Sequence, residues 1–136
     1  MIAIVTDVHY RMSLALIRDL SQAGVEVITC EWEGHRENPA SPAFGAMSRH
    51  TSRHVWLPED QGAEPIRELC REVMEERGER PALLPAGAAT LAAVAADREQ
   101  FDAVCGSELD GRRTDKAEVI AEALRGTDVH FGCGCG

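Results

Sequence analysis

The sequence has few aromatic residues, almost no lysine and no long apolar run. Aromatic residues make up 4% of its 136 residues, and of 14 basic residues only Lys116 is a lysine. No stretch approaches the roughly 20 apolar residues of a membrane-spanning helix, and the N-terminus lacks the basic region of a secretory signal peptide. A net charge of -9 argues against a nucleic-acid groove. These absences predict a cytoplasmic protein that binds neither membranes nor nucleic acids.

Several sequence motifs with known chemistry are also absent. The chain contains no G-x-G-x-x-G, no Walker A and no G-x-S-x-G motif, which argues against a dinucleotide fingerprint, a P-loop and a hydrolase elbow. A phosphoacceptor receiver domain needs an aspartate at the end of its third strand. Neither residues 53–58 nor residues 81–87 supply one.

The five cysteines divide into two groups. Cys30, Cys70 and Cys105 lie within apolar patterns, which predicts small buried side chains rather than disulfide partners. Cys133 and Cys135 form a C-x-C near the end of the sequence, and the nearest further ligand is His130. Because a structural zinc site takes about four ligands, we predict a frayed tail here and no metal site.

Apolar runs alternate with helical stripes along the chain. Strands are predicted at residues 1–6, 25–31, 53–57 and 82–84, with a weak fifth at 103–105. Helices are predicted at residues 13–23, 64–76, 90–96, 97–101 and 114–124, with a short one within 42–50. This order predicts an α/β, Rossmann-like three-layer domain with a mostly parallel sheet of four to five strands. We assign residues 1–127 to that domain and residues 128–136 to an irregular tail.

Polar residues gather where the predicted strands end. In parallel sheets, ligands bind beyond the carboxyl ends of the strands, which here are residues 6–11, 31–34 and 85–88. The first of these segments offers a carboxylate, an imidazole, a phenol and a guanidinium, from Asp7, His9, Tyr10 and Arg11. Two interpretations stay open. The segment binds an anionic or polar small molecule, or it is a capped turn in which Asp7 accepts hydrogen bonds from backbone amides.

Four segments follow one another in an order that is found in a known family. They are IVTDVHYRMSLALIRDLSQAGVEVITCE (residues 4–31), SRHTSRHVWLPED (48–60), PALLPAGAAT (81–90) and TDKAEVIAEALRG (114–126). Their order and spacing resemble the N-terminal domain of ATP-grasp ligases, in the branch of carboxylate–amine ligases and the carbamoyl-phosphate-synthase large chain. The resemblance spans residues 1–127.

The resemblance implies a pre-ATP-grasp domain that forms one side of a substrate and nucleotide cleft. Lys116 falls on the lysine that reaches the nucleotide phosphates in several family members. The substrate cleft would be lined by Thr6, Asp7, His9, Tyr10, Arg11, Pro85 and Gly87. ATP and magnesium would serve the intact enzyme, and we expect no cofactor for this chain alone. The implied partners are the catalytic ATP-grasp domain and a small-molecule substrate, with a homodimer as a further possibility.

We expect the chain to be a truncated ligase that is inactive by itself, because the family places its ATP-closing subdomains and magnesium-binding carboxylates later in the sequence. In the intact enzyme, ATP would activate a carboxylate as an acyl phosphate and an amine would attack it. Two alternatives without catalysis remain. One is a stand-alone α/β module that binds a small molecule, and the other is a self-associating interaction domain.

Overall fold

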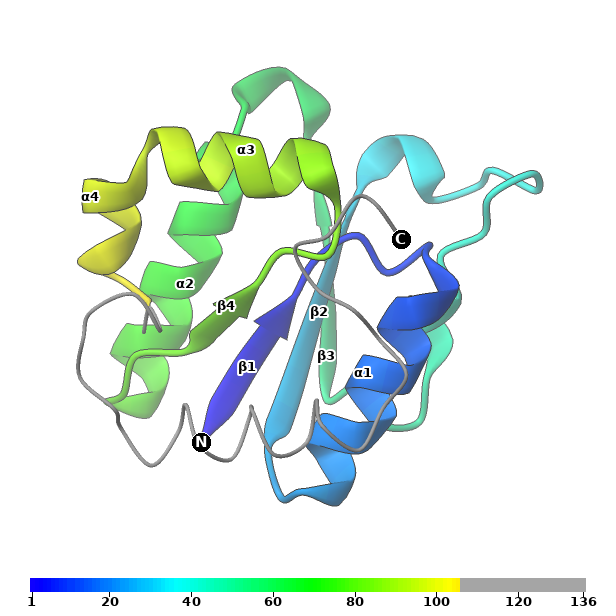
Figure 1. The fold of residues 1–136 in the computed structure, drawn as a ribbon, viewed down its shortest axis with the longest axis horizontal. Coiled ribbons are helices and arrows are strands. Elements are labelled where there is room, and N and C mark those ends of the chain that lie inside the picture. The colour runs from blue at the N-terminus through cyan, green and yellow to red at the C-terminus, as the bar shows by residue number, and fades with distance from the viewer. Residues whose placement is uncertain (106–136) are drawn as a thin grey trace.

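The computed structural model describes residues 1–105, which form an α/β domain around one parallel sheet. The sheet has four strands in the order β3-β2-β1-β4, and they all point the same way (Figure 1). The strands are β1 (Ile2–Val5), β2 (Glu26–Trp32), β3 (Arg53–Leu57) and β4 (Ala82–Leu84). The α/β class and the parallel sheet are therefore confirmed.

One face of the sheet is covered by α1 (Arg11–Gln22). Leu16, Ile17 and Leu20 form its buried stripe, at the spacing of a 3.6-residue period, and they pack with Val5 and Val27 of the sheet. Gly24 follows the helix with a φ of 86°, a left-handed conformation that glycine adopts without steric penalty. The chain can therefore turn directly from α1 into β2.

The opposite face is covered by α2 (Glu64–Arg77), with α3 (Ala88–Ala96) and α4 (Arg98–Asp102) following β4. Leu69 and Val73 of α2 pack with Ile4 and Ile28 of the sheet, and Phe101 of α4 completes this cluster. Both faces of β1 and most of β2 are thus buried, which explains their nearly continuous apolar sequence.

Short 3-10 helices occupy the connections around β3. They are η1 (Glu33–His35) and η2 (Phe44–Met47) between β2 and β3, and η3 (Glu59–Gln61) before α2. The predicted helix within residues 42–50 is therefore a single 3-10 segment. It packs on the α1 side of the sheet through Ala43 and Ala46.

The predicted fifth strand at residues 103–105 is wrong. These residues form a turn after α4, because the amides of Val104 and Cys105 both donate to the carbonyl of Phe101, at 3.0 and 2.9 Å. Their backbone donors are used locally and cannot join a sheet. The predicted helix at 114–124, the tail at 128–136 and Lys116 lie outside the described residues. Within residues 1–105, no helix has both the length and the apolar character to cross a bilayer.

Candidate functional site

The order of the strands creates a topological switch point at the carboxyl edge of the sheet, between β1 and β4. β2 and β3 lie on one side of β1 and β4 lies on the other. The loop after β1 leads to α1 on one face of the sheet, and the loop after β4 leads to α3 on the opposite face. The two loops start in contact, because the amide of Thr6 donates to the carbonyl of Leu84 at 3.2 Å. Such a switch point is where open α/β sheets bind their ligands. We call this region the switch-point edge: residues 6–11 and 85–87.

Asp7 joins the two loops of the switch-point edge. Its side chain is buried, and its backbone adopts a left-handed φ of 55°. Oδ2 accepts the backbone N–H of Gly87 at 3.1 Å and the hydroxyl of Thr6, while Oδ1 accepts the hydroxyl of Thr90 at 3.1 Å. The carboxylate also lies at the N-terminal end of α3, where the helix dipole favours negative charge. Asp7 is therefore a clamp between β1 and α3.

The clamp requires glycine at position 87. A Cβ atom there would lie 2.7 Å from Cγ and Oδ1 of Asp7, closer than carbon atoms normally approach. The absent side chain lets the backbone amide reach the carboxylate. A second link passes through Thr90, whose hydroxyl oxygen accepts Nε1–H of Trp32 at 3.3 Å. The start of α3 is thus tied to the ends of both β1 and β2.

The predicted cleft residues fall into two groups. Thr6, Asp7 and Gly87 are buried, and the Asp7 carboxylate accepts hydrogen bonds from the Thr6 hydroxyl and the Gly87 backbone amide, as the capped-turn interpretation requires. The remaining four reach solvent to different degrees: His9 and Pro85 are half-buried, and Tyr10 and Arg11 are exposed. The second group supplies the side chains of this edge that a dissolved ligand can contact.

The exposed group lies at the start of α1. Arg11 is the first residue of that helix, and no acidic residue occupies the first turn. In the part of the chain that the structure describes, no side chain caps the N-terminus of this helix. Among the described residues, no ion pair engages the Arg11 guanidinium. Free helix amides beside a cationic side chain favour an anionic ligand such as a carboxylate or a phosphate.

A second cluster joins this edge to the end of β2. Glu31 has a side chain with no exposed surface. Its Oε1 accepts the backbone N–H of His9 at 2.9 Å and lies 2.5 Å from Nδ1 of the His9 ring. Its Oε2 accepts the amide of Trp32 at 2.9 Å. The His9 ring stacks on His35, with centroids 4.0 Å apart and planes inclined by 8°. The Tyr10 ring also packs against the His9 ring, with centroids 4.1 Å apart and planes inclined by 35°.

Two titratable groups in β2 and β3 show the electrostatics beneath this cluster. Burial, together with the charges of Asp7 and Glu31, raises the pKa of the Cys30 thiol, so that thiol stays protonated. Burial also lowers the pKa of His54 to about 4. The His54 ring contacts the hydroxyl of Thr29 through Nδ1 at 2.7 Å, and its buried Nε2 has no hydrogen-bond partner within residues 1–105. Both groups are neutral at pH 7.

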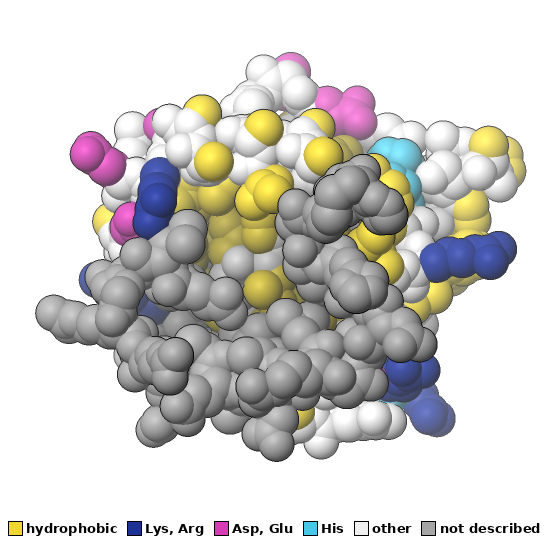
Figure 2. Space-filling view, viewed as in Figure 1, with side chains coloured by type: hydrophobic (Ala, Val, Ile, Leu, Met, Phe, Trp, Pro, Cys, Tyr) yellow, Lys and Arg dark blue, Asp and Glu magenta, His cyan; other side chains and the backbone are white. Residues whose placement is uncertain are grey.

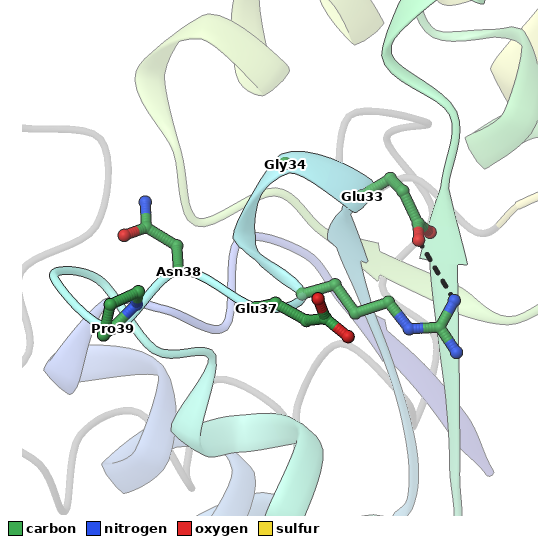
Figure 3. A pocket seen from close by; sticks show the side chains of 6 residues that line it. Glu33, Gly34, Glu37, Asn38 and Pro39 are labelled. Carbon is green, nitrogen blue, oxygen red and sulfur yellow. Dashed lines mark hydrogen bonds and ion pairs between the residues drawn. The ribbon is translucent and has the colours of Figure 1, made fainter.

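The surface beside η1 is hollowed into a shallow pocket of about 640 Å³ (Figure 3). Its polar lining comes from Glu33, Gly34, Arg36, Glu37, Asn38 and Pro39. Glu33 and Arg36 form an ion pair at 3.0 Å across it, and Glu59 of η3 accepts the Gly34 amide at 3.3 Å. None of the predicted cleft residues lines this pocket. It adjoins the histidine cluster through His35, the last residue of η1.

Comparison of the chain with protein-family models, with curated proteins and with solved structures finds no match.

Sequence reasoning missed Glu31, His35 and Thr90 as members of the site. A signal for Glu31 exists, because Thr29 and Glu31 are alternate polar residues within the buried part of β2, residues 27–31. Buried polar groups need partners, and the parallel register that pairs Val5 with Thr29 carries Glu31 alongside the loop that holds His9. His35 and Thr90 have no comparable signal, since their roles depend on where their loops and helices lie.

Proposed function

We propose that this chain is the substrate- and nucleotide-cleft domain of an ATP-dependent ligase of the ATP-grasp type, in the branch of carboxylate–amine and carbamoyl-phosphate-synthase-like enzymes. The observation that carries the proposal is the switch-point edge. There, an all-parallel sheet in the order β3-β2-β1-β4 brings together the loops that the family resemblance assigns to the cleft. The Asp7 clamp holds these two loops in a fixed relation.

The exposed side chains of the edge fit a small ligand that carries a carboxylate. Arg11 offers a guanidinium that can bind a carboxylate through two hydrogen bonds, and the start of α1 offers free backbone amides. Tyr10, with a side chain 41% exposed, offers a phenol and an aromatic face. In the proposed enzyme these groups would hold the substrate. The catalytic domain would bind ATP and magnesium and would catalyse the phosphoryl transfer.

Helix α3 supports a partner surface beside this edge. Its sequence is almost entirely apolar, yet most of its residues are exposed, and Leu91 is 45% exposed. Figure 2 shows hydrophobic side chains gathered along this helix. An exposed row of apolar side chains on a soluble monomer is typical of a surface that binds a partner. We assign this surface to contact with the catalytic domain of the ligase.

Amide chemical shifts of the ¹⁵N-labelled chain test the substrate site directly. We expect L-glutamate or L-aspartate to shift the amides of Tyr10, Arg11 and Gly87 in a saturable manner. Arg11→Gln should weaken this response at least about fivefold, whereas Arg18→Gln, a matched change of an exposed arginine on the same helix, should leave it unchanged. Shifts confined to other regions, or an equal loss in both variants, would rule out the assigned site.

A further inference from the structure

Two free thiols are in contact on the α2 side of the sheet. In the structure, Cys30, Cys70 and Cys105 are free and buried, as their apolar sequence patterns predict. Cys70 lies in α2 and Cys105 lies in the turn after α4, yet their thiols are hydrogen-bonded to each other. Because the Cys105 thiol donates its proton to the carbonyl of Phe101 at 3.0 Å, the Cys70 thiol is the one that donates to the Cys105 sulfur. The fold thus holds together two sulfur atoms whose residues are 35 positions apart in the sequence.

The two thiols of this pair differ in how easily they lose a proton. The hydrogen bond from Cys70 lowers the pKa of the Cys105 thiol more than burial raises it, and the positive charge of Arg80 also lowers it. The same hydrogen bond, together with burial, raises the pKa of the Cys70 thiol. The thiolate is the reactive form of cysteine. Cys105 is therefore the sulfur that reacts first with an oxidant, and Cys70 is the neighbouring thiol that can resolve the oxidised sulfur.

A hollow in the surface lies beside the pair. Its volume is about 310 Å³, and it is bounded by α2, by Gln100 of α4 and by the turn that contains Val104. Arg71, which follows Cys70 in α2, also lines the hollow, and Val104 directly precedes Cys105. Small solutes can therefore approach the protein beside both residues. Hydrogen peroxide is small and uncharged, so among oxidants it fits an approach to buried thiols best.

We propose that hydrogen peroxide joins Cys70 and Cys105 in a disulfide that ties the turn after α4 to α2. The Cys105 thiolate attacks one peroxide oxygen, the O–O bond breaks, and the hydroxide that leaves takes up the thiol proton and becomes water. Cys105 is then a sulfenic acid. The Cys70 sulfur attacks the Cys105 sulfur, the S–O bond breaks as the S–S bond forms, and the hydroxyl group leaves with the Cys70 proton as a second water. The two thiols are oxidised and the peroxide is reduced, and the site does not depend on the ligase proposal.

Peptide mapping of the full chain after treatment with hydrogen peroxide tests the proposal. Trypsin cleaves after arginine, which places Cys70 in the peptide of residues 68–71, Cys105 in residues 99–112 and Cys30 in a third peptide. Without reductant, we expect the first two peptides to be found joined, at their summed mass less two hydrogen atoms, and to separate after dithiothreitol. The oxidised chain should also unfold at a urea concentration about 1–2 M higher than the reduced chain, because the cross-link restricts the unfolded state.

Controls separate a native pair from chance oxidation. The chain carries Cys133→Ser and Cys135→Ser, so that the C-x-C adds no thiols. Cys30→Ala, which removes the other buried thiol of the same cluster, should leave the joined peptides in place, whereas Cys105→Ala should abolish them and the rise in urea midpoint.

Oxidation of the parent chain in urea gives a reference that does not depend on how the variants fold. The native chain should form the Cys70–Cys105 pair at least about tenfold more than either pair with Cys30, whereas in urea the three pairs should form in similar amounts, since loop closure depends only weakly on length. The proposal is wrong if the native chain forms no joined peptides, if it gives the same mixture as the chain in urea, or if the joined chain unfolds at the midpoint of the reduced chain.

Discussion

Removal of the Asp7 carboxylate should destabilise the domain far more than removal of an exposed carboxylate. In Asp7→Ala, the buried amide of Gly87 loses its acceptor, and an unsatisfied buried N–H costs about 1–3 kcal/mol. The hydroxyls of Thr6 and Thr90 lose the same acceptor but can rotate toward others. Alanine also tolerates the φ of 55° less well than aspartate does, by about 1 kcal/mol. We therefore expect a total loss of about 2–4 kcal/mol in the free energy of unfolding.

Asp7→Gly separates the two contributions. Glycine loses the acceptor as alanine does, but it accepts the left-handed backbone. The left-handed backbone costs alanine about 1–2 kcal/mol more than glycine, while the larger entropy of glycine in the unfolded chain costs about 0.5–1 kcal/mol. The free energy of unfolding of Asp7→Gly should therefore be about 0.5–1 kcal/mol higher than that of Asp7→Ala. Asp60→Ala removes an exposed carboxylate of η3 and serves as the matched control, with an expected change within about 0.5 kcal/mol.

Urea unfolding followed by far-ultraviolet circular dichroism measures all three variants. With a slope of about 2 kcal/mol per molar urea, the midpoint of Asp7→Ala should fall by about 1–2 M. A midpoint equal to that of Asp60→Ala would refute the clamp. A midpoint for Asp7→Gly at or below that of Asp7→Ala would refute the contribution of the backbone conformation.

Further predictions concern the same buried groups. Gly87→Ala should lose about 1–3 kcal/mol in urea unfolding through its clash with the Asp7 carboxylate, and it should lose less in the Asp7→Gly background. Thr90→Val, which keeps the shape but removes the hydroxyl, should lose about 1–2 kcal/mol by the same assay. Burial lowers the pKa of His54 from 6.5 to about 4, so as the pH falls the unfolded chain protonates this histidine before the folded chain does. The stability that depends on neutral His54 is therefore present above pH 6.5 and is lost toward pH 4. His54→Gln should make the urea midpoint vary less over that pH range, and an unchanged pH profile would contradict this. Iodoacetamide should leave Cys30 unmodified in the native chain and alkylate it after unfolding, as mass spectrometry of its peptide can verify.

The strands of this fold can be predicted from the sequence because the residue types that favour a strand, and the turn residues that bound it, are neighbours in the chain. Residues 82–84 are a short apolar run, residues 53–57 end in the β-favouring residues Val55 and Trp56 and in Leu57, and the two segments coincide with β4 and β3. The helices at 64–76 and 90–96 are predicted within two residues of their observed ends. Residues 103–105 are also apolar, but the amides of Val104 and Cys105 donate to the carbonyl of Phe101 and form a turn. No local sequence pattern shows that these amides bond within a turn and not to a neighbouring strand.

Only part of the candidate site can be predicted from the sequence. The position of the polar segment after β1 follows from the alternation of strands and helices. The division of this segment into a buried clamp and an exposed group cannot be predicted from the sequence. Asp7 and Gly87 are 80 residues apart in the sequence and come together only through the pairing of β1 with β4. The same holds for His9 and Glu31, which the pairing of β1 with β2 brings together.

The source DNA that follows codon 136, read in all three frames, gives the most direct test of the proposed function. The ligase account predicts a coding segment for an ATP-grasp catalytic domain there, in frame or out of frame, with the carboxylates that hold magnesium. An unrelated gene after a genuine stop codon would contradict it, and the chain would then be a binding or interaction domain in its own right.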